Sequence, residues 1–274
     1  MDLRLLDRHG LSGTAIVAMR VLAALRILAP IILFLLLWQS LGSFHLVDTA
    51  FLPTPVLIGR ALGDLLTGHE IRDNISVTLV RAFTGLGLAI VTGAWLGVGM
   101  ARSPVFRSYV SPLVGATYSL PKTALVPLLI LWFGIGNTMA IVAVYLSALL
   151  PVVVHTYHGV MATPPVLVWS AEALGTSRRK LLWQIFLPHA LPDIFTGIRI
   201  ALGFAFVVAL SAEMIASTAG IGRLIFLYGE NGSYDYMFAA VVSVVLVAFI
   251  ADRALLGVGT WCLRWHASAV DVEQ

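Results

Sequence analysis

Residues 158–188 read HGVMATPPVLVWSAEALGTSRRKLLWQIFLP and connect two long apolar stretches of the chain. A proline disfavours helical backbone at the residue before it, so Thr163-Pro164-Pro165 is expected to end the first of the two apolar stretches. Val166 to Leu174 contains no glycine or proline and predicts a short helix that ends at Gly175. The basic cluster Arg178-Arg179-Lys180 begins a second helical run. The pattern is helix, turn, helix, which is typical of an exposed element that inserts into a groove on a soluble partner.

The composition on both sides of this loop is that of a membrane protein. The chain has 274 residues, of which 59% are hydrophobic and 11% charged, and its mean hydropathy is +0.94. A soluble domain has about 45–50% apolar and about 25% charged residues, so an ordinary soluble enzyme is excluded. The net charge is +3, but the basic residues flank apolar runs instead of forming a basic face, so no nucleic-acid partner is expected. The single cysteine, Cys262, allows no internal disulfide and no multi-cysteine metal site.

The apolar sequence predicts six membrane-spanning helices, because each needs roughly 20 mostly apolar residues. They are expected at Leu25–Leu41, Ile75–Met100, Val110–Phe133, Met139–Tyr157, Ala190–Ala216 and Met237–Trp261. Prolines interrupt the third, which we expect to begin as a helix at the membrane edge and then bend inward. The predicted fold class is all-α integral membrane, with a single domain over residues 1–274 and terminal tails at about 1–24 and 262–274.

The placement of lysine and arginine predicts the orientation, because basic residues are retained on the cytoplasmic side. With the N-terminus inside, eleven of the 17 basic residues are cytoplasmic, three are external and three lie within spans. Both termini are therefore expected in the cytoplasm, as are the two tails and the loop at 158–188. The three basic residues within spans are Arg81, Lys122 and Arg199.

Small residues recur every four positions in two of the predicted spans and form ridges along which helix backbones can approach closely in lipid. The ridges consist of Gly85, Ala89, Gly93 and Gly97 in the second span, and Gly197, Ala201, Ala205 and Ala209 in the fifth. Continued by four residues, each ridge reaches a charge, Arg81 and Glu213 respectively. Because unpaired charges are costly in a membrane, we expect these two to pair inside the bundle. The alternative is that Arg81 reaches the headgroups and Glu213 reaches external water.

Lys122 lies between the prolines that interrupt the third span, where exposed backbone permits water inside a bundle. It is therefore a candidate cation near the path of an anionic cargo. The alternative is that it anchors the chain at the cytoplasmic membrane edge. Arg199 is expected to face water or a carboxylate that the sequence does not identify.

Residues that would carry out a reaction are not recognisable in the sequence. ATP hydrolysis by this chain would need a glycine-rich loop ending in Gly-Lys-Ser/Thr, and neither Lys122 nor Lys180 follows a glycine. No nucleophile, base and acid share a known spacing, and His155 and His158 lack further metal ligands nearby. The chain is therefore not expected to be an enzyme or to hold a metal or cofactor.

The spacing of the loop resembles the cytoplasmic motif of bacterial ATP-binding-cassette importer permeases. Gly175 is followed nine residues later by Ile185, and then by Phe186, Leu187 and Pro188, as in that motif. The Glu-Ala-Ala of the motif falls on Trp169, Ser170 and Ala171, so its acidic position is absent here. Glu172, three residues along, lies on a neighbouring face of the helix, where a similar contact is a possibility left open.

Further stretches resemble the nitrate, sulfonate, taurine and bicarbonate branch of these permeases, and together they cover residues 51–261. They are Leu52 to Pro55, Val77 to Gly85, Leu120 to Pro127, Leu131 to Gly136, Ala212 to Ile215 and Gly220 to Gly222. The resemblance implies a type I (MetI-like) permease of the bacterial inner membrane that pairs with a second copy of itself, receives a small anion from an external binding protein and couples to separate ATPase subunits. The coupling residues it implies are Trp169, Ser170, Ala171, Glu172, Gly175, Ile185, Leu187 and Pro188, with Pro188 setting the entry angle of the next helix.

Two other classes of function stay open to the sequence. A carrier driven by an ion gradient would not need the cytoplasmic loop, and it often shows inverted repeats and acidic residues at mid-depth, neither of which is evident here. An intramembrane enzyme would need paired catalytic groups at one depth. Lys122, Arg199 and Glu213 are scattered instead.

Overall fold

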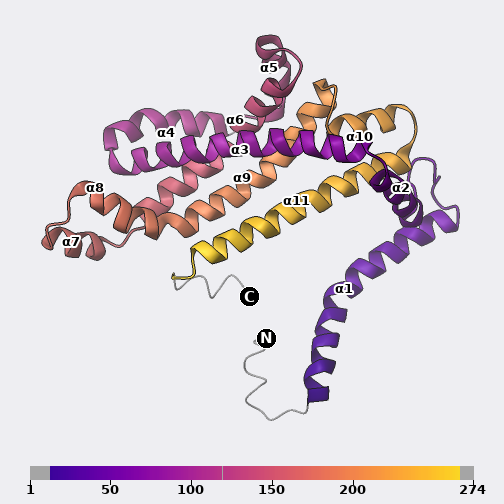
Figure 1. Ribbon diagram of the computed structural model, residues 1–274, viewed down its shortest axis with the longest axis horizontal. Helices are drawn as coiled ribbons and strands as arrows, with labels where there is room; N and C mark the ends of the chain where they lie inside the picture. Colours follow the sequence, from indigo (N-terminus) through magenta and orange to yellow (C-terminus); the bar gives the residue numbers. More distant parts are fainter. Residues whose placement is uncertain (1–12, 119, 266–274) are drawn as a thin grey trace.

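The computed structural model describes residues 13–118 and 120–265, and these form helices joined by short connections. The helices α3, α6, α9 and α11 lie side by side in one bundle, with α7 and α8 at one end and α10 at the other, whereas α1 runs away from the bundle (Figure 1). The elements are α1 (Gly13–Ser43), α2 (Pro55–Thr67), α3 (Glu70–Arg102), α4 (Pro104–Tyr118), η3 (Lys122–Leu125), α5 (Val126–Phe133), α6 (Asn137–Met161), α7 (Pro165–Ala173), α8 (Arg178–Leu181), η4 (Leu182–Phe186), α9 (Leu187–Ala216), α10 (Ile221–Glu230) and α11 (Tyr234–Cys262). This confirms the all-α fold class.

Four stretches of helix are long and apolar enough to span a membrane, namely Glu70–Arg102, Asn137–Met161, Arg178–Ala216 and Tyr234–Cys262. A fifth span is possible if the bent pair of α4 with η3 and α5 crosses together. The apolar part of α1, Leu28–Ser43, is shorter than a full span. The count of six therefore stays a prediction, and so does the orientation.

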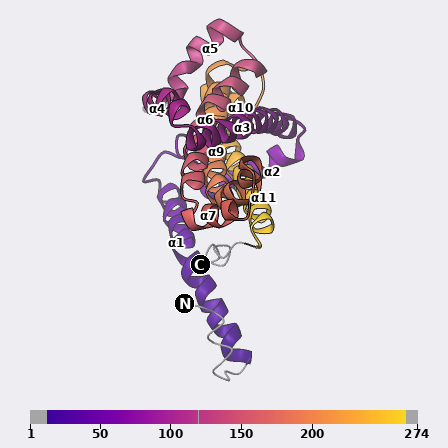
Figure 2. The ribbon, with the colours of Figure 1, turned by 90° about the vertical axis from the view of Figure 1, so that its left-hand side faces the viewer.

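The predicted third span is not one straight helix. α4 and the η3–α5 segment meet at an angle of 93°, and α5 projects away from the long axis of the bundle (Figures 1 and 2). Pro121 immediately precedes η3 and is extended, which ends the helical ladder there. A bend at the prolines is confirmed, its inward direction stays a prediction, and α4 begins at Pro104, before the expected Val110.

The glycine ridge of α3 packs against α6, and that of α9 packs against a neighbouring face of α6. A Cβ atom added to Gly97 would lie 2.6 Å from Thr156 Cβ, and one added to Gly93 would lie 3.0 Å from Val152 Cβ. A Cβ added to Gly197 would lie 2.6 Å from His155 Cβ. Gly85 makes the same close approach to Val144. Both ridges are therefore packing faces, as their spacing predicts.

The connection between α6 and α9 contains the expected helix, turn and second helix. α7 ends before Gly175, whose φ of +74° is a left-handed conformation that favours glycine. The second helix differs from the prediction, because α8, η4 and α9 form one continuous helical stretch from Arg178 to Ala216. Pro188 therefore sets no entry angle. A π-helical turn at Leu182–Phe186 precedes it and widens the helix where proline lacks an amide donor and needs room.

We expect Gly97→Ala to destabilise the bundle by about 1–3 kcal/mol, because the added methyl group would meet the backbone oxygen of Val153. Gly87 is the matched control, since a Cβ at that position of the same helix meets nothing within 4 Å. The free energy of unfolding in mixed micelles measures the difference. Equal stabilities of the two variants would contradict the close packing of α3 on α6.

Candidate functional site

Arg81 and Glu213 form an ion pair inside the bundle, 3.0 Å from Arg81 Nη1 to Glu213 Oε1. Their side chains are 3% and 0% exposed, so neither reaches headgroups or water. The pairing predicted from the two ridges is confirmed, and the alternative of separate exposed charges is wrong. Because α3 carries Arg81 and α9 carries Glu213, the pair ties together two helices that both pack on α6.

Hydrogen bonds to backbone and side chains satisfy the rest of the pair. Arg81 donates to Asn137 Oδ1 at 2.8 Å and to the Ala219 carbonyl at 2.8 Å. The carboxylate of Glu213 accepts from the Thr78 hydroxyl at 2.9 Å and from the Gly222 amide at 3.0 Å. These bonds add the start of α6 and the start of α10 to the network.

Gly220 and Gly222 are needed for this geometry. Gly220 has a φ of +112°, and a Cβ there would collide with the Glu213 carboxylate. A Cβ on Gly222 would collide with the Leu210 carbonyl. The Gly-Ile-Gly stretch therefore lets α10 begin directly over the buried acid, whose negative charge is favoured at a helix N-terminus.

Arg199 has a partner that the sequence did not identify. Its Nε and Nη2 donate to the two carboxylate oxygens of Asp252 at 2.6 Å and 3.0 Å, joining α9 to α11. The side chains are 45% and 24% exposed, so this pair faces outward from the single chain. A bidentate arginine–carboxylate pair fixes the relative rotation of two helices.

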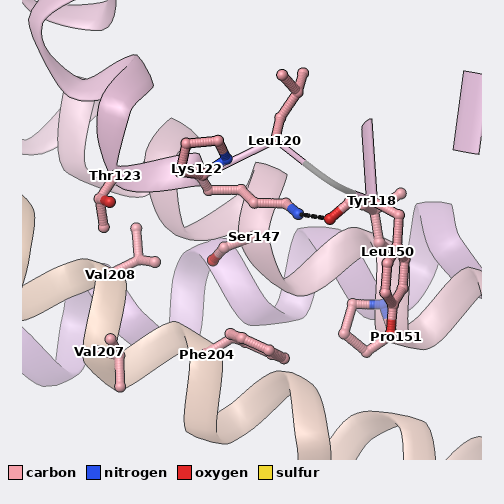
Figure 3. Close-up of a pocket in the computed structure, with 11 residues that line it drawn as sticks. Tyr118, Leu120, Lys122, Thr123, Ser147, Leu150, Pro151, Phe204, Val207 and Val208 are labelled. Atoms are coloured by element: carbon pink, nitrogen blue, oxygen red, sulfur yellow. Dashed lines mark hydrogen bonds between the residues drawn. The ribbon is translucent and has the colours of Figure 1, made fainter. Parts of the chain in front are cut away.

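Lys122 lies beside a cavity of about 300 Å³ between η3, α6 and α9 (Figure 3). Its ammonium group donates to the Tyr118 carbonyl at 2.8 Å and lies 5.7 Å from the centre of the Tyr118 ring. Ser147 and Phe204, both near the middle of their helices, line the same cavity. Lys122 therefore lies level with the middle of α6 and α9, and both alternatives for its role stay predictions.

The loop residues implied by the permease resemblance do not form one cluster. Trp169 and Glu172 on α7 are exposed, and Glu172 borders a cavity of about 330 Å³ shared with Arg102 and Arg178. Ile185, Leu187 and Pro188 are half-buried at the base of the α9 stretch. Ser170, Ala171 and Gly175 lie on α7 and its end. The structure therefore separates an outer part of the loop from a part packed on the bundle.

A third cavity, of about 390 Å³, lies at the end of the bundle that bears α10. Tyr228 donates to Glu70 at 3.3 Å at its edge. Burial, together with the nearby Glu70 carboxylate, raises the pKa of Tyr228 to about 12. The hydroxyl therefore keeps its proton, and remains a donor, across the physiological pH range.

We predict that Arg81→Gln lowers the free energy of unfolding by roughly 3–5 kcal/mol, because it leaves the Glu213 carboxylate buried without its counter-charge. The double variant Arg81→Gln with Glu213→Gln is expected to cost less than the sum of the singles, with a coupling of about 0.5–3 kcal/mol. A double-mutant cycle in mixed micelles measures this coupling. The Arg199–Asp252 pair is the control, and its coupling is expected to be smaller because it is more exposed. Additive losses at Arg81 and Glu213 would contradict the pairing.

Comparison with known sequences gives this architecture a family. Residues 85–257 match the family described as binding-protein-dependent transport system inner membrane component. The taurine transport system permease protein TauC of Escherichia coli (strain K12) is 31% identical over 237 residues, which cover 85% of this chain and 86% of that protein. The putative aliphatic sulfonates transport permease protein SsuC of Bacillus subtilis (strain 168) is 28% identical over 232 residues, covering 85% and 84%.

Solved structures share the fold. The MetNI methionine transporter in an inward-facing conformation matches with a TM-score of 0.61 at 20% identity, covering 69% of this chain and 94% of that one. A bacterial transporter that imports alginate matches with a TM-score of 0.60 at 16% identity, covering 88% and 96%. The type I importer fold expected from the resemblance is thereby confirmed. The chain belongs to the binding-protein-dependent transport system inner membrane components, the permeases of ATP-binding-cassette importers.

Proposed function

We propose that two copies of this permease form a membrane passage for a small sulfonate such as taurine, which an external binding protein delivers and a separate pair of ATPase subunits drives inward. The cargo class is supported by relatives named for taurine and aliphatic sulfonate transport. The energy source is supported by the loop at 158–188, the observation on which the proposal chiefly rests. The loop lies at the end of the bundle opposite α10 (Figure 1).

The outer part of this loop has the character of a surface that a partner covers. Leu174 is 86% exposed, and the indole side chains of Trp169 and Trp183 are 67% and 69% exposed. Exposed large apolar side chains gathered in one short loop are typical of an interaction surface. The Arg178-Arg179-Lys180 cluster beside them is also exposed and offers charges to the rim of such an interface.

The continuous helix from Arg178 to Ala216 supports a route for the movement. Its first residues belong to the loop, and its last turns carry Glu213 into the network with Arg81. In the proposed cycle, closure of the ATPase pair displaces α7 and the start of this helix. α9 then rotates as a rigid body, which carries the displacement to the end of the bundle that bears α10. The passage closes on one side of the membrane and opens on the other.

Co-purification and uptake test the proposed assembly. The permease, expressed with the ATPase and binding protein of its own system, is expected to purify as a complex that imports taurine into proteoliposomes only when ATP is present on the ATPase side. Uptake of taurine at the same rate by the permease alone, or driven by an ion gradient, would refute the proposal.

We expect Gly175→Ala to lower ATP hydrolysis stimulated by the binding protein by about 5–30-fold, because a side chain at φ +74° costs about 1–2 kcal/mol in the conformation that the loop needs. Gly232 is a matched control. Its φ is +70°, and a Cβ there, as at Gly175, meets nothing within 4 Å. Gly232→Ala therefore imposes the same backbone strain away from the loop and is expected to leave stimulation unchanged. An equal loss in both variants would indicate general instability, and would argue against a coupling role for Gly175.

A further inference from the structure

Lys122 is a cation without a counter-charge among the described residues. Of the three basic residues that the sequence places within spans, Arg81 pairs with Glu213 and Arg199 pairs with Asp252. Lys122 forms no ion pair with any carboxylate in residues 13–118 and 120–265. Within the described part of the chain, its one hydrogen bond goes to the carbonyl of Tyr118, which is the last residue of α4. An ammonium group has three donors, so two remain for another partner.

The cavity beside Lys122 combines this cation with hydroxyl groups and an apolar wall. Thr123 and Ser147 contribute hydroxyls, and none of the residues that line the cavity is acidic. The wall opposite the ammonium group is apolar (Figure 3) and consists of Leu150, Pro151, Phe204, Val207 and Val208. A cationic corner facing an apolar wall suits a small molecule with an anionic head and a short organic part.

The depth of the cavity limits what the ammonium group can meet. Ser147 lies near the middle of α6 and Phe204 near the middle of α9. Lipid headgroups are therefore out of reach, and a cation facing acyl chains at this depth would be costly. Phe204 and Val207 are 50% and 59% exposed in the single chain, so the cavity is open on that side. The cost is avoided if this opening faces a water-filled passage.

From this geometry we infer that the Lys122 cavity is a binding site for the sulfonate head of the cargo, at the middle of the passage. The ammonium group holds the sulfonate oxygens, and Phe204, Val207 and Pro151 contact the carbon chain. The inference rests on the proposed function, because the cargo class comes from there. It goes further in giving the permease its own affinity for the anion, separate from that of the binding protein.

Taurine uptake by the reconstituted complex tests the site during transport. Lys122→Gln is expected to reduce uptake by at least about tenfold, because it removes one hydrogen bond to a charged group. Stimulated ATP hydrolysis is expected to stay within about twofold of that of the unmodified protein. Lys122→Arg keeps the charge and is expected to keep uptake. Arg60→Gln removes an exposed cation on α2 and is the control. Unchanged uptake in Lys122→Gln, or an equal fall of uptake and ATP hydrolysis, would overturn the inference in favour of a simple cap on α4.

A reaction-rate measurement tests the site without transport or partners. Val207→Cys, in the full chain with Cys262→Ser, places a thiol in the cavity wall. The reaction rates of this thiol with sulfonatoethyl methanethiosulfonate and with neutral methyl methanethiosulfonate are compared. Lys122→Gln is expected to lower the ratio of the first rate to the second by at least about tenfold. An unchanged ratio would overturn the anion site whatever the uptake. A lowered ratio in a protein that imports no taurine would uphold the anion site and refute the proposed function alone.

Discussion

The architecture depends on the rule that a charge inside a membrane bundle must have a partner, since even lenient insertion scales assign about 2.5–3.5 kcal/mol to an isolated one. Arg81 and Glu213 satisfy each other while 3% and 0% exposed, and their remaining hydrogen bonds reach the starts of α6 and α10. This geometry is accessible only because small residues let α3 and α9 approach α6 closely, as at Gly97 and Gly197. The packing ridges and the ion pair are thus parts of one arrangement.

The ion-pair network and the loop at 158–188 lie at opposite ends of one continuous helical stretch from Arg178 to Ala216. A stiff helix transmits rotation along its length, whereas a corner at Pro188 would have absorbed part of it. The π-helical turn at Leu182–Phe186 is the local adjustment that lets the proline lie within the helix. A single helix held by buried hydrogen bonds at one end and exposed at the other is suited to turning a push on the loop into movement of the bundle.

Sequence periodicity identified the Arg81–Glu213 pair because both residues continue ridges whose spacing is local to one helix. It could not identify Asp252 as the partner of Arg199, since that contact depends on the rotation of α11 relative to α9, which tertiary packing sets. The loop was predicted as helix, turn, helix from Gly175 and the prolines, but the entry angle expected at Pro188 is absent because a π-helical turn accommodates the proline within the helix. The third span shows the same limit. Its bend followed from the prolines, whereas the depth of Lys122 depends on packing against α6 and α9.

A cation that serves a passing anion should not have a fixed partner of its own. A carboxylate beside Lys122 would neutralise it permanently, as Asp252 does Arg199, and leave no attraction for a sulfonate. A cluster of several cations would hold the anion too tightly for release, since transit requires binding that is favourable enough for entry and weak enough for departure. One ammonium group beside an apolar wall meets both conditions. The hydrogen bond to the Tyr118 carbonyl holds the lysine at the cavity edge without neutralising its positive charge, because a carbonyl is neutral.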